Sequence, residues 1–378
     1  MDRRAFLRAG IGSVVAGSGA LAGCSSLFNV QYGQRLPPVP ENRPSGVYYP
    51  SHIEGMDMVG MSGMTGMNAT TSHTNHSGNG QTTDDSRYVC ALMYSYPHRF
   101  WTVTGNRTNK VAIQDGDSIH LMVSVWDRKT GVYFMDTTPA VTISQNGETV
   151  TTVRPWTMLT QNMGFHAGDN VALPGGGTYS VTVDVPPTAA RRTGAFDGQF
   201  TTKQSFEFEF EYSNQKRNDI TFEILEKKAG KRGAVEPMTM KQMPLAFAPK
   251  QSELPGRILG TKTSGDGEFV VTAIENASRF GADGKTYLAV SPRTPYNRYI
   301  LPSMSLSARV VRNDKTVFDG PLTTTLDPEL NYHYGTVVER IDSGDELELI
   351  IDAPPQVARH EGYETAFLEM PQRTIRIE

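Results

Sequence analysis

Two histidines occupy matching places in two similar stretches of the 378-residue chain. His166 begins the stretch HAGDNVALPGGGTYSVTVDVPP, and His333 begins the stretch HYGTVVERIDSGDELELIIDAPP. In both stretches a glycine follows two residues later, and Asp-x-Pro-Pro closes an alternating apolar run. Because imidazole nitrogen is a good ligand for several transition metals, the repeated histidine indicates a doubled metal-binding module.

The two stretches belong to a longer internal repeat. A shift of 167 residues aligns the halves almost without gaps, and one inserted residue before Asp352 makes the shift 168. In this alignment Tyr287 stands opposite His120, and Arg192 stands opposite His360. Such a repeat indicates two copies of one domain, with possible metal ligands divided unevenly between them.

Alternating apolar and polar residues predict the strands that position these side chains. In the segment 119–125, Ile, Leu and Val side chains share one face, while His120 and Met122 share the other. The segment 139–153 predicts a hairpin with Asn146-Gly147 as its turn. We expect an all-β fold of two tandem immunoglobulin-like antiparallel β-sandwich domains after a disordered N-terminal tether. The expected boundaries are 87–213 for the first sandwich, 214–250 for a linker and 251–378 for the second sandwich.

Composition and motifs exclude other classes of function. The net charge of -4 and the pI of about 6.1 give no basic surface for nucleic acid, so no nucleic-acid partner is expected. The chain has neither a Gly-x-Ser-x-Gly elbow nor a His-Glu-x-x-His pair, the motifs of two large classes of hydrolase. We therefore expect a binding protein that is not an enzyme.

The first 24 residues resemble an export signal. Arg3 and Arg4 precede a weakly apolar run, which ends in the lipobox-like sequence Leu-Ala-Gly-Cys at residues 21–24. This order of features is typical of a twin-arginine signal peptide on a lipoprotein. We expect Cys24 to carry membrane lipid and to anchor the chain at the extracytoplasmic face of the cell membrane, in the periplasm or at the cell surface.

Residues 25–86 read as a flexible tether because they are rich in Pro, Gly, Ser and Thr and have no sustained periodicity. Methionine and histidine recur within this segment, and thioethers suit Cu(I). A second metal-binding region and a low-complexity spacer both fit this composition. The possible ligands in the tether are His52, Met56, Met58, Met61, Met64, Met67, His73 and His76.

The sequence IHLM, the hairpin that follows it and the stretch GFHAGDNVALPGGGTYSVTVDVPP resemble the periplasmic ferrous-iron transport protein family. Members of this family are Cu- and Fe-binding immunoglobulin-like proteins that dimerise and assist oxidase-dependent iron permeases. The resemblance implies a copper or iron ion, or both, and an iron permease as partner. It also implies four ligands: a His on an early strand, a Met, a His in a His-x-Gly-x-Asn turn, and a His after Arg.

Carried over to this chain, the resemblance implies two incomplete sets of metal ligands, one in each copy. The first copy has the strand His and the turn His, with Met158 or Met163 as the thioether, but it lacks the late His. The second copy keeps the turn His and the late His, but it lacks the strand His. The predicted metal ligands are His120, Met122, Met158, Met163, His166, His333 and His360.

One complete site forms if the two copies pack as an internal pseudo-dimer, like the dimer of the family. If the late His crosses the interface between the copies, the site contains His120, Met158 or Met163, His166 and His360. If the strand His crosses, His120 meets His333 and His360. His360 and His120 share an ion in both cases. We interpret His98, beside a proline and two aromatic residues, as structural. Two other functions fit the pattern: a surface structural or adhesion module without metal in the fold, and copper buffering by the tether alone.

Overall fold

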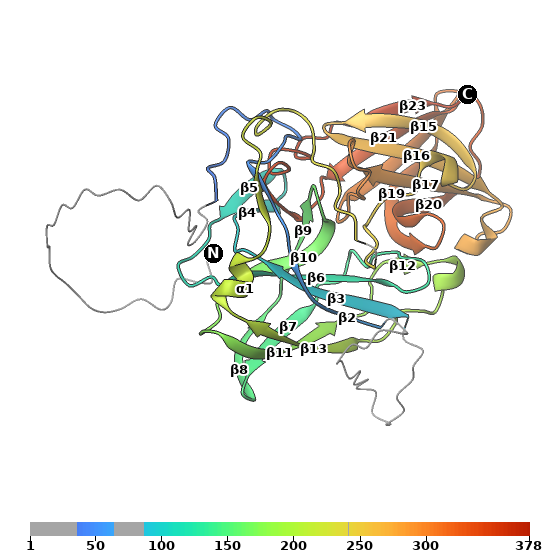
Figure 1. Ribbon diagram of the computed structural model, residues 1–378. Coiled ribbons are helices and arrows are strands. Elements are labelled where there is room, and N and C mark those ends of the chain that lie inside the picture. The colour runs from blue at the N-terminus through green and yellow to red at the C-terminus, as the bar shows by residue number, and fades with distance from the viewer. Residues whose placement is uncertain (1–35, 64–86, 241) are drawn as a thin grey trace, which may run out of the picture. The chain divides into compact units, whose positions relative to one another are not determined.

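Antiparallel β-sheets form the framework of the chain in a computed structural model that describes residues 36–63, 87–240 and 242–378 (Figure 1). The expected all-β fold is confirmed. The short helices of the described residues are α1 (Asn214–Asn218) and three 3-10 turns at Gly194–Phe196, Gln251–Glu253 and Ala277–Phe280.

The N-terminal half, residues 87–213, contributes to two packed sheets. One is an eight-stranded sheet of order β2-β3-β6-β10-β9-β22-β4-β5, and the other has the order β13-β11-β7-β8. Apolar side chains from both sheets, such as Val123 and Phe208, lie in one buried cluster. The strands are β2 (Asp57–Ser62), β3 (Tyr88–Ser95), β4 (Phe100–Thr104), β5 (Arg107–Val111), β6 (Ile119–Asp127), β7 (Ala140–Gln145), β8 (Glu148–Val153), β9 (Trp156–Thr160), β10 (Gly164–Val171), β11 (Gly177–Val185), β13 (Gln204–Tyr212) and β22 (Ala358–Arg359).

Part of this strand order recurs in the C-terminal half, residues 251–378. Its sheet runs β15-β16-β17-β20-β19-β18-β21-β23, and the long strand β19 pairs with β20 through residues 323–327 and with β18 through residues 315–322. The series β16-β17-β20-β19 thus corresponds to β3-β6-β10-β9. The strands are β15 (Arg257–Ser264), β16 (Gly267–Glu275), β17 (Thr286–Arg293), β18 (Ser305–Arg312), β19 (Lys315–Asp327), β20 (Asn331–Val338), β21 (Glu346–Ala353) and β23 (Arg373–Arg376).

The predicted hairpin turn is present between β7 and β8. Asn146 and Gly147 have φ values of 54° and 82°, the left-handed conformation that a two-residue turn of this kind requires. Asn313 and Asp314 adopt the same conformation between β18 and β19, with φ values of 48° and 59°. Asparagine and aspartate tolerate this region better than most residues, which explains why the two hairpins close alike.

Each half donates a short late strand to the other half. β22 lies between β9 and β4, parallel to β9 and antiparallel to β4. β12 (Arg191–Arg192) pairs in parallel with β19. These exchanged strands bring residues that are about 200 positions apart in the sequence, such as Met158 and Ala358, into register.

The predicted tether differs from the structure over residues 36–63, and this part of the prediction is wrong. β1 (His52–Glu54) pairs with β14 (Phe222–Ile224) from the predicted linker, and β2 pairs with β3. Val47, Tyr48 and Met61 are buried. The two strands are too short to give a recognisable period, so the Pro- and Gly-rich composition concealed them. Residues 25–35 and 64–86, like the expected signal peptide and Cys24, lie outside the described residues.

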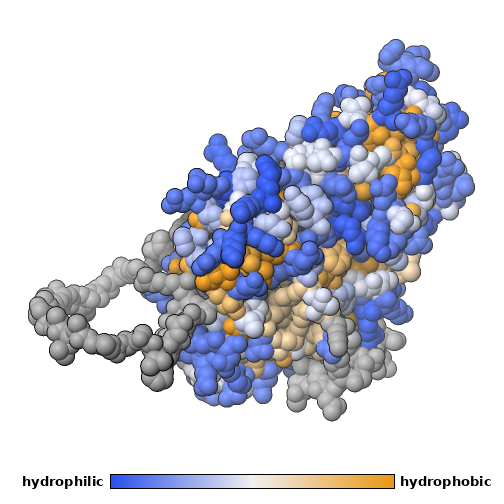
Figure 2. Space-filling model, turned by 45° about the horizontal axis from the view of Figure 1, so that its top comes forward, coloured by the Kyte–Doolittle hydropathy of each residue, from blue (hydrophilic) through white to orange (hydrophobic). Residues whose placement is uncertain are grey.

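Hydrophilic side chains dominate the molecular face seen in Figure 2, and apolar side chains show only between them. Among the described residues the large exposed apolar side chains are Ile113, Trp156, Ile224, Tyr296 and Val317. None of the helices in the described ranges is both long enough and apolar enough to cross a membrane.

The buried N-terminal segment should contribute to stability. A chain that begins at residue 64 should unfold at lower urea concentration than one that begins at residue 36, because it loses β1, β2 and the burial of Val47, Tyr48 and Met61. Burial of three such side chains stabilises a protein by roughly 5 kcal/mol. Equal unfolding midpoints for the two chains would show that residues 36–63 do not pack on the fold.

Candidate metal centre

Four histidines and one methionine converge between the two halves of the chain. Ring nitrogens of His98, His120 and His360 lie within 4.8 Å of one another. The ring of His166 is centred 6.3 Å from that of His120 and 5.2 Å from that of His360. The Nε2 atom of His360 is 2.9 Å from the sulfur of Met158. His120, Met158 and His166 are fully buried, and His360 is half-buried.

Strand register sets the positions of the side chains from the N-terminal half. In the sheet, β10 lies between β6 and β9, where Asn170 faces His120 and His166 faces Met158. Residues 166, 168 and 170 share one face of β10 because strand side chains alternate. The middle residue is Gly168, and a Cβ there would lie 2.5 Å from Nε2 of His120 and 3.1 Å from the sulfur of Met158. The glycine therefore keeps a space open among the three side chains.

His360 reaches this space from the C-terminal half because it follows the exchanged strand β22. Its backbone N–H donates to the carbonyl oxygen of Leu159 at 3.0 Å, which continues the pairing of β22 with β9. The ring of His360 is centred 5.6 Å from that of His120. The structure thus brings together the residues of the first predicted arrangement, in which the late His crosses, and contains Met158 rather than Met163 at the thioether position.

The side chain of Asn170 fixes the tautomer of His120. Its amide nitrogen donates to the carbonyl oxygen of His98 at 2.9 Å, so its oxygen is left to accept from Nδ1–H of His120 at 2.9 Å. With the proton on Nδ1, the Nε2 atom of His120 carries a free lone pair. Nδ1 of His166 lies 3.4 Å from the carbonyl oxygen of Gly164, which favours the same tautomer.

Three imidazole nitrogens face the space without a partner. Within the part of the chain that the structure describes, the buried Nε2 atoms of His98, His120 and His166 accept or donate no hydrogen bond. Burial disfavours the charged imidazolium, and it lowers the pKa of His166 to about 3 and the pKa of His120 and His360 well below the usual value. His120, His166 and His360 are therefore neutral at pH 7, the form in which imidazole binds metal.

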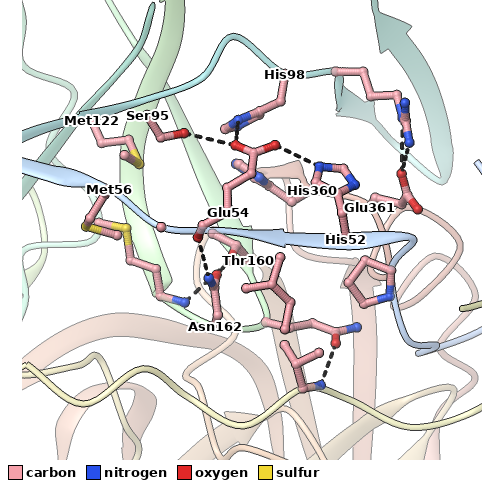
Figure 3. A pocket seen from close by; sticks show the side chains of 17 residues that line it. His52, Glu54, Met56, Ser95, His98, Met122, Thr160, Asn162, His360 and Glu361 are labelled. Carbon is pink, nitrogen blue, oxygen red and sulfur yellow. Dashed lines mark hydrogen bonds and ion pairs between the residues drawn. The ribbon is translucent and has the colours of Figure 1, made fainter. Parts of the chain in front are cut away.

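Glu54 of β1 adjoins the cluster. Its carboxylate accepts from Nδ1 of His98 at 2.8 Å and pairs with Nε2 of His52 at 2.7 Å (Figure 3). Burial raises the pKa of Glu54, but the neighbouring His98 and His52 outweigh this effect and hold the pKa well below its usual range. A cavity of about 70 Å³ lies beside Glu54, and His98 and His360 form part of its wall.

The corresponding place in the C-terminal half is filled by a tyrosine. The hydroxyl group of Tyr287 lies 3.0 Å from Nε2 of His333 and 3.2 Å from Oγ1 of Thr325. A Cβ at Gly335, the counterpart of Gly168, would lie 2.2 Å from that hydroxyl oxygen. Arg192, opposite His360 in the sequence alignment, donates to the carbonyl oxygen of Thr188 instead. His333 therefore has a hydrogen-bond partner and lies apart from the histidine cluster.

The remaining predicted residues occupy several places. Met122 and Met163 are buried and line the cavity, as do His52 and Met56 from the predicted tether. Met58 and Met61 belong to the hydrophobic core and its margin. Met64, Met67, His73 and His76 lie outside the described residues.

Sequence reasoning missed His98 and Glu54. His98 was interpreted as structural, yet it lies in the cluster, because the turn between β3 and β4 carries it toward β6 and β10. His98 matches no histidine in the second copy, and Glu54 precedes the repeat, so the only available signal was the residue types themselves. Their meeting depends on the pairing of β1 with β14, which the sequence did not predict.

Comparison with known proteins identifies part of the chain. Residues 125–214 match the family model described as Fe2+ transport protein. This part of the chain is similar to the Fe2+ transport protein family. The match confirms the resemblance drawn from the sequence. The matched range contains Met158, His166 and Gly168, whereas His98, His120 and His360 lie outside it.

Other comparisons are less informative. Residues 252–376 match a domain of unknown function, DUF7350. A crystal structure of FetP from uropathogenic E. coli strain F11, expressed recombinantly in the periplasm of another E. coli strain, is 16% identical to the chain, with a TM-score of 0.26. That similarity covers 43% of this chain and 96% of FetP. None of the curated proteins matches the sequence.

The buried neutral histidines should make the metal-free protein less stable in mild acid. Burial lowers the pKa of His120, His166 and His333, the last to about 4, so the unfolded chain binds protons below pH 6.5 that the folded chain does not. Each of the three should reduce the free energy of unfolding by about 1.4 kcal/mol per pH unit below 6.5, until the folded pKa is reached.

Urea unfolding of the metal-free protein at pH 7.0, 6.0 and 5.0 measures this effect. A His333→Gln variant should show a smaller dependence on pH, by about one proton. An unfolding free energy that is constant across this range would contradict the assignment of neutral buried histidines.

Proposed function

We propose that the protein binds one iron or copper ion in the His/Met centre and assists iron uptake by a membrane permease. The observation that carries this proposal is the set of buried imidazole nitrogens without partners around the space kept open by Gly168. A buried polar atom without a partner costs roughly 1–3 kcal/mol. An ion bound there would satisfy several such atoms at once. His120, Met158, His166 and His360 would hold it.

The chemistry of the ligands favours copper, whereas the match to an iron-transport family favours iron. Imidazole and thioether ligands are borderline to soft, a combination that favours Cu(I) or Cu(II), whereas Fe(II) accepts imidazole but gains from oxygen ligands. The match to the Fe2+ transport protein family supports iron as the cargo. Both ions therefore belong to the proposal, with no catalysed reaction beyond metal binding and transfer.

The two halves would act as an internal pseudo-dimer of tandem repeats. The shift of 167 residues is supported by strand register, since Gly168 faces Met122 just as Gly335 faces Ala289. The exchange of β12 and β22 between the halves supports the same idea. One centre would bind metal, while the Tyr287 hydroxyl takes the place of an ion in the other.

The proposed location is the extracytoplasmic face of the cell membrane, through lipid on Cys24. The order of twin arginines, apolar run and lipobox in residues 1–24 supports it. A chain tethered there could pass an ion to a permease in the same membrane. Lipid labelling of Cys24, compared with a Cys24→Ala variant, tests this part independently.

Metal titration of the chain from residue 36 tests the proposal. We expect one Cu or Fe(II) ion per chain, with affinity reduced at least 100-fold in both His120→Ala and His360→Ala, because each removes one ligand of a shared ion. His333→Ala, which also removes a buried imidazole, should retain wild-type affinity and serves as the control.

Isothermal calorimetry under anaerobic conditions and metal analysis after gel filtration give affinity and stoichiometry. Failure of the wild-type protein to bind either metal would refute the proposal and would favour a surface structural or adhesion module. Metal that stays bound when His120 and His360 are both replaced by Ala, but is lost when Met64, Met67, His73 and His76 are replaced, would assign copper buffering to the tether.

The cavity beside the centre is the proposed access route for the ion. Three of its lining residues, Met56, Met122 and Met163, carry thioethers that could exchange a soft ion stepwise toward His98 and His360. Replacing all three by Leu conserves volume and should slow the loading of Cu(I) at least tenfold in stopped-flow measurements, while the equilibrium affinity stays within threefold of wild type. An unchanged loading rate would exclude this route.

A further inference from the structure

His98 approaches the centre from the turn between β3 and β4, outside residues 125–214, which match the Fe2+ transport protein model. We propose that His98 is a further ligand of the bound ion and that Glu54 positions it. This inference rests on the proposed function, because it adds a residue to the same site. With His98 the centre has four imidazoles, three from the N-terminal half and one from the C-terminal half. Strand β1, which contains Glu54, then becomes part of the metal site.

The ring of His98 lies against two proposed ligands. Its centroid is 3.8 Å from that of His120 and 4.4 Å from that of His360. Ring nitrogens of the three histidines fall within 4.8 Å of one another, close enough for one ion to reach all three. His98 is only 5% exposed, so its ring belongs to the interior of the centre.

The two nitrogens of His98 have different surroundings. Nδ1 lies 2.8 Å from Oε2 of Glu54 and 3.1 Å from the carbonyl oxygen of Tyr96, and both of these oxygens are acceptors. The proton therefore sits on Nδ1. Nε2 is buried and has no partner within the described residues. A histidine with a purely structural role would be expected to satisfy both nitrogens, since an unpaired buried nitrogen is unfavourable.

Glu54 is itself held firmly in place. Its carboxylate accepts from the hydroxyl group of Ser95 at 2.9 Å and pairs with Nε2 of His52 at 2.7 Å. Figure 3 shows this carboxylate between the three side chains that bind it. A carboxylate on the far nitrogen of a metal-bound histidine orients the ring and makes it a stronger ligand. The negative charge of Glu54 would also partly offset the charge of the ion.

One amide group couples His98 to His120. The side chain of Asn170 accepts from the backbone N–H of His98 at 3.2 Å and donates to its carbonyl oxygen at 2.9 Å. The same side-chain oxygen accepts from Nδ1 of His120. Asn170 thus holds both the main chain of His98 and the ring of His120, so the two rings are positioned by the same side chain.

X-ray absorption spectroscopy and calorimetry of the Cu(II)-loaded chain from residue 36 test this inference. His98→Phe keeps a ring of similar volume without nitrogen, and it should lose one imidazole from the coordination shell with a 10–100-fold loss of affinity. Glu54→Gln should keep the number of imidazoles, weaken binding by up to the same factor and shift the Cu(II) electron paramagnetic resonance spectrum. His333→Gln, which changes a buried imidazole outside the cluster, should retain both the coordination shell and the spectrum.

The outcomes separate the inference from the proposed function. Wild-type protein without bound metal would refute the proposed function. Metal bound by wild type, with an unchanged imidazole count and affinity in a folded His98→Phe variant, would overturn only the role of His98. If that variant fails to fold by circular dichroism, Glu54→Gln decides: an unchanged affinity and spectrum would overturn the inference, and a weaker affinity with an altered spectrum would support it.

Discussion

The pairing of β22 with β9 is the interaction on which the centre depends. Two residues of the C-terminal half add to a sheet of the N-terminal half, and the backbone hydrogen bond from His360 to Leu159 extends that pairing by one position. Without it, His98, His120, His166 and Met158 of the N-terminal half would lack the ring of His360 beside them. With it, a half-buried imidazole covers them. Main-chain hydrogen bonds thus place the His360 side chain against three other imidazole rings and the sulfur of Met158.

Burial of neutral imidazoles gives the centre its chemical character. The surrounding strands exclude water, so His120 and His166 keep their lone pairs available at neutral pH. Asn170 then directs the lone pair of His120 inward by holding the opposite nitrogen. The apolar core and one amide group together leave these nitrogens unprotonated, so the proposed ion would not have to displace a proton from them.

The sequence predicted much of the fold and part of the centre. Alternation and the Asn-Gly turn predicted β6, β7 and β8, because these signals are local. The family resemblance, carried over to both halves, predicted that His120 and His360 would meet, because it implied which ligand each half lacked. Glu54 and His98 escaped prediction, since their approach depends on long-range pairing of short strands with no period of their own. The choice between Met158 and Met163 also required the register of β9 and β10.

Tyr287 makes the two halves of the molecule chemically different. A symmetric pair of sandwiches offers two equivalent faces, and a partner could dock on either one. Here a phenol hydroxyl closes one centre with hydrogen bonds to His333 and Thr325, while the other keeps its imidazole nitrogens free. Under the proposed function, only the half of the chain with free imidazole nitrogens would release an ion, so an acceptor would have to meet the chain in one orientation and as one acceptor per chain.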